Sequence, residues 1–126
     1  MRDLPSGTAL LALGRDLIEE LLPLLPLERH RELRLVATAM AIAEREAIAG
    51  DAPRRDILRL LAEFYGCSES GPDDALLRRF AADLRAGAFD ACDMRGRDAR
   101  AILWRLTMLK LREGNPLFLA RNGFGE

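Results

Sequence analysis

Apolar side chains recur at helical spacing along almost the whole chain. Each apolar segment fits a period of about 3.6 residues, and no segment alternates apolar with polar residues as a half-buried strand would. Gly and Pro separate these segments and mark the turns between them. The pattern therefore predicts an all-α fold with five helices, near residues 8–22, 27–50, 51–65, 72–87 and 97–112.

The second of these segments, residues 27–50, is apolar on most of its circumference. Between Leu33 and Ile48 it contains neither Gly nor Pro, is rich in Ala, and leaves only a narrow polar stripe. A helix of this kind needs neighbours on more than one side. We therefore expect residues 1–126 to form a single helical domain, a five-helix bundle in which this Ala-rich helix is central.

The first, third and fourth helices each have one apolar face that we expect to be buried. In the first helix, charged residues lie opposite a face formed by Leu10, Leu13, Leu17, Ile18, Leu21 and Leu22. In the third and fourth helices the face comprises Ile57, Leu58, Leu60, Leu61, Phe64, Leu76, Leu77, Phe80 and Leu84. Residues 88–96 are expected to be a connection, and residues 117–119 to pack back on the bundle.

The composition excludes more function classes than it indicates. Of the 126 residues, 49% are hydrophobic and 31% charged, and the formal net charge is -1, so no global field draws the protein to nucleic acid or to an anionic membrane. No apolar run is long enough to span a bilayer. Cys67 and Cys92 lack metal-type spacing and are expected to be free thiols in a cytoplasmic protein. We expect no metal and no cofactor.

Arginines lie along the polar stripe of the Ala-rich helix. Arg34 and Arg45 belong to this stripe, and guanidinium groups can bind a phosphate or a carboxylate through two parallel hydrogen bonds. Glu46 projects into an otherwise apolar arc and could line a small pocket with them. These three residues are the candidate ligand-binding site. The alternative is structural, since the stripe can form ion pairs with Glu19, Glu20 or Asp83 of neighbouring helices.

No motif in the chain indicates catalysis, and we assign no catalytic residue. His30 is the only histidine, and no partner that would orient it as a general base is visible, so we expect it at the surface or at a helix end. Thr38 is expected to donate to a carbonyl one turn earlier. A nucleophile elbow, a Gly-rich phosphate loop and a metal-binding motif are all missing from the sequence.

The fifth helix carries a second apolar stripe, nearly opposite the one that faces the core. Trp104, Met108 and Leu111 form this stripe, and Arg105 and Arg112 lie beside it. Trp, Met and Arg are enriched in protein interfaces, so these five residues are the candidate interface. The alternative is that the C-terminal tail buries the stripe through Leu117 and Phe118. Nucleic-acid binding is disfavoured, because there is no aromatic stacking platform.

Several short motifs resemble a bacterial family of small uncharacterised helical proteins. The matching segments are Leu4-Pro5-Ser6, LLPLLP at 21–26, VATAMAIAERE at 36–46, LRAGAFD at 84–90, Lys110-Leu111, and Asn115-Pro116 followed by Leu119. Genes of that family often lie beside aminoglycoside-phosphotransferase-like kinases and acyl-CoA dehydrogenases. The resemblance implies no known activity, only an accessory relation to such enzymes. The family often has Asn where this chain has Thr38.

Two hypotheses of function remain open. The first is a non-catalytic helical accessory or interaction module, either a homodimer or the small partner of a phosphotransferase-like or acyl-CoA enzyme, which docks through the Trp104 stripe. The second is a ligand-binding or enzymatic bundle that holds a phosphate ester or acyl thioester near Arg34, Arg45 and Glu46.

Overall fold

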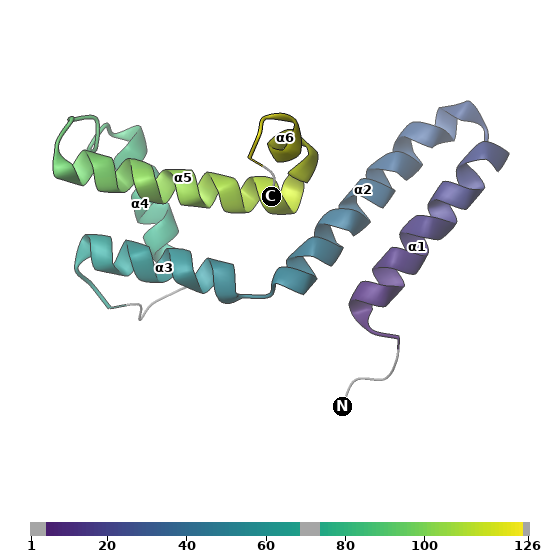
Figure 1. The fold of residues 1–126 in the computed structure, drawn as a ribbon, viewed down its shortest axis with the longest axis horizontal. Coiled ribbons are helices and arrows are strands. Elements are labelled where there is room, and N and C mark those ends of the chain that lie inside the picture. Colours follow the sequence, from purple (N-terminus) through teal and green to yellow (C-terminus); the bar gives the residue numbers. More distant parts are fainter. Residues whose placement is uncertain (1–4, 69–73, 125–126) are drawn as a thin grey trace. The chain divides into compact units, whose positions relative to one another are not determined.

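The computed structural model describes residues 5–68 and 74–124, and it confirms the all-α prediction. These residues form six α-helices and one 3₁₀ turn and include no strand (Figure 1). The elements are α1 (Gly7–Leu21), η1 (Leu22–Leu24), α2 (Leu27–Ala49), α3 (Ala52–Tyr65), α4 (Ala75–Arg85), α5 (Met94–Gly114) and α6 (Pro116–Arg121). The short sixth helix forms where the sequence predicted only a segment packing back on the bundle.

Helix boundaries follow the capping residues. Ser6 caps α1, since its hydroxyl accepts a hydrogen bond from the Ala9 amide at 3.3 Å. Helix α5 begins at Met94, earlier than predicted, because the Asp93 carboxylate accepts from the Gly96 amide at 2.7 Å. The expected loop at 66–71 and the expected start of the fourth helix at Pro72 lie partly outside the described residues.

The chain folds as two compact units, Met1–Gly50 and Asp51–Glu126. The first is an antiparallel hairpin in which α1 lies beside α2 (Figure 1). Arg15 Nη1 lies 2.8 Å from Glu44 Oε2 across this hairpin, and both side chains are partly buried. This ion pair therefore links the two helices of the hairpin through a carboxylate in an otherwise apolar part of α2. The expectation that residues 1–126 form a single domain stays a prediction, because two compact units can belong to one domain.

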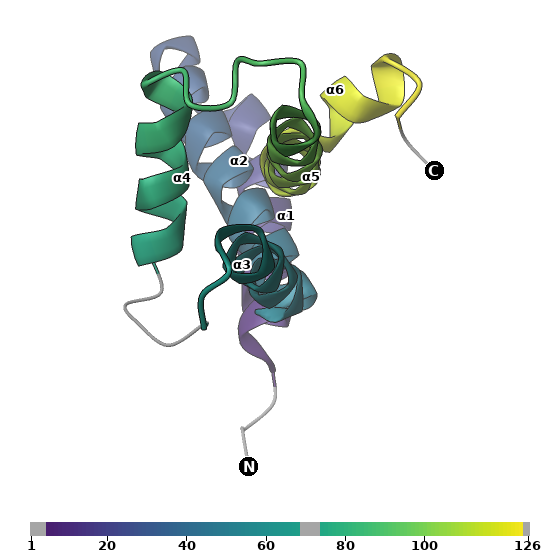
Figure 2. The ribbon, with the colours of Figure 1, turned by 90° about the vertical axis from the view of Figure 1, so that its left-hand side faces the viewer.

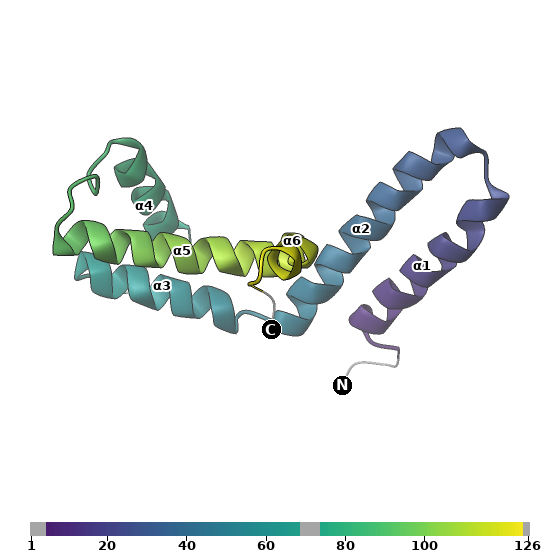
Figure 3. The same ribbon diagram turned by 45° about the horizontal axis from the view of Figure 1, so that its top comes forward.

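The second unit contains the buried core. Helix α5 runs alongside α3, and α4 packs against α3 (Figures 2 and 3). Between them lies a cluster of buried side chains: Ile57, Leu61, Phe80, Phe89, Ala99 and Ile102. Phe80 is only 1% exposed, and its ring stacks on Phe89 with centroids 5.9 Å apart. The burial predicted for Ile57, Leu61 and Phe80 is confirmed.

The Ala-rich helix α2 belongs to the first unit, whereas the buried core lies in the second, so its predicted central position in a five-helix bundle stays a prediction. In the described residues, no side chain of α1, η1 or α2 is buried. Met40 and Ile42 are half-buried, while Val36 is exposed. Alanine side chains enclose little apolar volume, so the α1–α2 pair buries less than the second unit, whose Phe and Leu residues fill a core.

The buried face predicted for the first helix is wrong for four of its six residues. Leu10, Leu13, Leu17 and Leu21 are 54%, 60%, 53% and 41% exposed. Ile18 and Leu22 of the predicted face are half-buried, together with Leu11 and Gly14 on the neighbouring side of α1. Helix α1 is apolar on both sides, and the side that approaches α2 is the one where Gly14 leaves room for the Met40 side chain.

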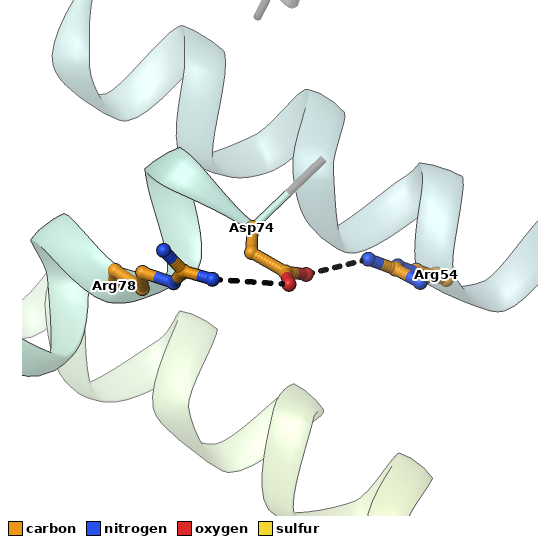
Figure 4. A network of polar contacts seen from close by, with 3 residues as sticks. All are labelled: Arg54, Asp74 and Arg78. Carbon is orange, nitrogen blue, oxygen red and sulfur yellow. Dashed lines mark hydrogen bonds and ion pairs between the residues drawn. The ribbon is translucent and has the colours of Figure 1, made fainter. Parts of the chain in front are cut away.

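Polar contacts in the second unit tie α4 to α3. Asp74 precedes α4, and its carboxylate lies 2.8 Å from Arg54 Nη2 and 3.7 Å from Arg78 Nη2 (Figure 4). These side chains are exposed, so the network contributes little free energy and acts mainly on orientation. Tyr65 donates a 2.6 Å hydrogen bond to Asp83. Burial, followed by this bond, raises the pKa of Tyr65 well above its usual value, so the phenol stays protonated.

Candidate functional site

The second unit contains a groove along the seam between α3 and α5. Its volume is about 390 Å³. Four of the five predicted interface residues line it, namely Trp104, Arg105, Met108 and Arg112. The opposite wall comes from α3, through Pro53, Asp56, Ile57 and Leu60. The fifth predicted residue, Leu111, is half-buried and does not line the groove.

Trp104 stands at this groove with much of its surface open. Its side chain is 53% exposed. The ring of Phe124 lies edge-on to the indole, with centroids 5.6 Å apart and an interplanar angle of 68°. The C-terminal tail thus covers part of Trp104 but does not bury it. Leu117 and Phe118, which we considered as a cover, are themselves exposed.

The charges along the groove are unevenly distributed. Within the described part of the chain, neither Arg105 nor Arg112 forms an ion pair, whereas Asp56 lies 3.5 Å from Arg59. A second hollow of about 360 Å³ continues along the same seam and shares Leu60 and Arg105 with the groove. Its acidic residues are Glu63 and Asp98. The seam is therefore basic near Arg112 and contains acidic side chains toward the other end.

The structure does not bring the three predicted ligand-binding residues together. Arg34 lines a depression of about 470 Å³ on α2, together with Leu27, His30, Arg31, Leu35 and Thr38. Arg45 lies on the same helix, roughly 16 Å further along the axis. Glu46 is turned roughly 100° from Arg45 and is exposed. A small ligand held by Arg34 would thus not reach the other two.

Two polar residues of this depression have local structural partners. His30 Nε2 lies 2.9 Å from the Leu25 carbonyl oxygen, which favours the tautomer with the proton on Nε2. His30 thus bonds across the turn before α2, as expected for a histidine at a helix end. The Thr38 hydroxyl donates to the Arg34 carbonyl at 2.8 Å, which confirms the expected bond within the helix.

Other residues that shape the second unit were missed in the sequence. Phe89 lies in the segment expected to be a mere connection, yet it is a core residue. The guanidinium of Arg95 lies 4.4 Å from the centroid of the Phe64 ring. Asp93 was detectable as a helix N-cap, since Asp is favoured there. No sequence pattern indicated the α3 wall of the groove, because α3 and α5 are far apart in the chain and meet only in the folded structure.

Comparison with known proteins identifies a family and nothing more specific. Residues 23–118 match the family described as Domain of unknown function (DUF6285). No curated protein and no solved structure matches the chain. Among the described residues, no helix is long and apolar enough to cross a bilayer. No group of three His, Cys, Asp or Glu side chains in residues 5–68 and 74–124 is placed to hold a metal ion.

Proposed function

Because the chain belongs to the DUF6285 family, a domain of unknown function, its own surfaces are the guide to its role, and we propose that it is a non-catalytic helical module that binds a partner protein. The observation that supports this proposal is the α3–α5 groove. There an exposed Trp104, a half-buried Met108 and two arginines line one apolar hollow. Trp and Arg supply a large share of the binding free energy in many interfaces.

The groove suits an amphipathic helix of the partner. A groove between two helices can take a third helix, whose apolar residues at positions i, i+3, i+4 and i+7 enter the hollow. Arg105 and Arg112 form no ion pair within the described residues and therefore favour acidic side chains beside those apolar ones. We therefore propose an acidic amphipathic helix as the bound element.

The first partners to test are enzymes. The sequence resemblance described above implies an accessory relation to phosphotransferase-like kinases or to acyl-CoA enzymes. We propose that the protein is a small cytoplasmic accessory subunit of such an enzyme and that it contributes no catalytic residue. This part of the proposal rests on the resemblance, and the groove provides the docking surface it requires.

The groove can be tested with a synthetic helix of leucine and glutamate. Trp104 is the only tryptophan, so its fluorescence reports on the groove directly. We expect the peptide to shift the Trp104 emission to shorter wavelength with saturation, because a bound helix excludes water from the indole. A matched peptide of leucine and lysine should bind at least about tenfold more weakly, a difference of about 1.4 kcal/mol.

Variants complete this test. Arg112→Glu and Met108→Glu should each abolish the preference for the acidic peptide, while Leu117→Glu, at an exposed position that does not line the groove, should preserve it. The same variants can then be compared by native mass spectrometry with a candidate enzyme. Equal binding of both peptides, or equal loss in all three variants, would contradict docking through this groove.

A second candidate function is the binding of an anionic ligand. The observation that favours it is the depression on α2, where Arg31 and Arg34 face one hollow and neither forms an ion pair within the described residues. A thermal-shift screen with nucleotides, coenzyme A esters and sugar phosphates should then show stabilisation. Arg34→Ala should abolish it, and Arg45→Ala, outside the depression, should leave it unchanged. A flat screen would leave only the docking proposal.

A further inference from the structure

The α1–α2 hairpin carries an exposed apolar face that is separate from the α3–α5 groove of the other unit. We define this leucine face as Leu10, Leu13, Leu17 and Leu21 of α1 with Val36 of α2. All five side chains are between 41% and 60% exposed. A helix pair without a single buried side chain has little apolar stabilisation of its own, so burial of this face would stabilise the hairpin.

The two helices contribute to the same side of the hairpin. Gly14 lies one turn from Leu10 and Leu17 on α1, and a Cβ placed on it would be only 2.7 Å from Met40 Cε on α2. Val36 lies one turn before Met40. The close approach of Gly14 to Met40 therefore sets the leucines of α1 beside Val36.

The spacing of the leucines is that of helices packed along their length. Leu10, Leu17 and Leu24 are seven residues apart, and Leu13 and Leu21 lie between them. The successive steps are three, four, four and three residues, and apolar residues at steps of three and four form the seams of coiled coils and helix bundles. A hairpin that offers one such seam pairs naturally with a second hairpin, because two antiparallel helix pairs make a four-helix bundle.

We infer that the leucine face is covered by the same face of a second copy of this chain. All five members of the face are aliphatic, and the charged residues at its margin are Asp16 and Glu20 of α1 and Glu32 of α2, one turn before Val36. Interfaces of homodimers are the more apolar class, whereas the groove with its two arginines has the mixed composition of an interface with a different protein. A two-fold contact also matches the face to itself by symmetry.

The available area is sufficient for a modest dimer. With about 90 Å² of accessible surface on each half-exposed aliphatic side chain and less on the neighbouring alanines, each copy offers roughly 500 Å². Two copies would bury about 1,000 Å², the lower limit for a specific interface. We therefore expect a dimer that dissociates on dilution. This inference is independent of the proposed function, since every groove residue lies in the other unit.

Sedimentation equilibrium of the full chain, from low to high micromolar concentration, tests the inference. The wild-type mass should rise with concentration toward twice the 14.0 kDa of one chain. Leu17→Glu should raise the dissociation constant at least about tenfold, because it places a charge within the apolar seam. The far-ultraviolet circular dichroism should stay unchanged, since Leu17 is exposed in the single chain.

Leu35→Glu is the matched control. Leu35 is another exposed leucine of the hairpin, but it lies about 140° around α2 from Met40. This variant should dimerise like the wild type. The milder Leu17→Ala should weaken the dimer to an intermediate degree. It provides the same test if the glutamate variant fails to fold. A wild-type protein that stays monomeric at high micromolar concentration, or equal weakening by Leu17→Glu and Leu35→Glu, would overturn the inference.

Discussion

Phe80→Ala should lower the free energy of unfolding by about 3–5 kcal/mol, as truncations of buried aromatic residues do. Phe80 is 1% exposed, and its ring contacts those of Phe64 and Phe89, at centroid distances of 6.2 Å and 5.9 Å. The substitution leaves a cavity among residues from three helices, which cannot all close in without losing their other contacts. Such a loss is a large share of the roughly 5–15 kcal/mol that stabilises a typical domain.

Urea unfolding provides the measurement. Trp104 fluorescence follows the second unit, where Phe80 lies, and circular dichroism follows the helices of both units. Phe118→Ala is the matched control, because Phe118 is the same residue type but exposed, and it should cost less than about 1 kcal/mol. Similar losses for the two variants would show that the core is not centred on Phe80.

Gly96→Ala should lower the free energy of unfolding by about 3 kcal/mol, at the upper end of the cost of overpacking. Gly96 is buried in the first turn of α5. A Cβ at this position would overlap the carbonyl oxygen of Ala91 and lie 2.9 Å from that of Phe89. Both obstacles are backbone atoms, so relief requires moving the segment before α5, which places Phe89 in the core and Asp93 at the cap.

Gly114→Ala serves as the control for this prediction. Gly114 ends the same helix, and a Cβ there would meet no atom within 4 Å. Because Ala restricts the unfolded chain and favours a helix, this variant should be neutral or more stable by up to about 1 kcal/mol. Thermal unfolding of both variants, followed by circular dichroism, checks the contrast. If Gly96→Ala melted at the wild-type temperature, the close packing before α5 would be refuted.

Parts of the candidate site were accessible from the sequence and parts were not. Trp104, Met108, Arg105 and Arg112 stand out because Trp, Met and Arg share one helix outside its core-facing stripe. Asp56 and Leu60 on the opposite wall do not, since nothing local indicates which helix will lie against α5. Arg34, Arg45 and Glu46 illustrate the opposite case, in which a shared helix suggests a site but the rise of the helix separates the residues.

The sequence by itself determined the five longer helices and most of the residues that end them, but not the short helix α6. Periodicity, Pro and Gly positions and capping residues act within a few residues of each other, so Ser6 at the start of α1 and Gly50 after α2 can be recognised without any tertiary contact. Only the tertiary structure decided which apolar face is covered. Helix α1 offers two such faces, and the approach of Gly14 to Met40 selected one and left the leucine face open. That choice depends on packing between distant segments, which no local pattern encodes.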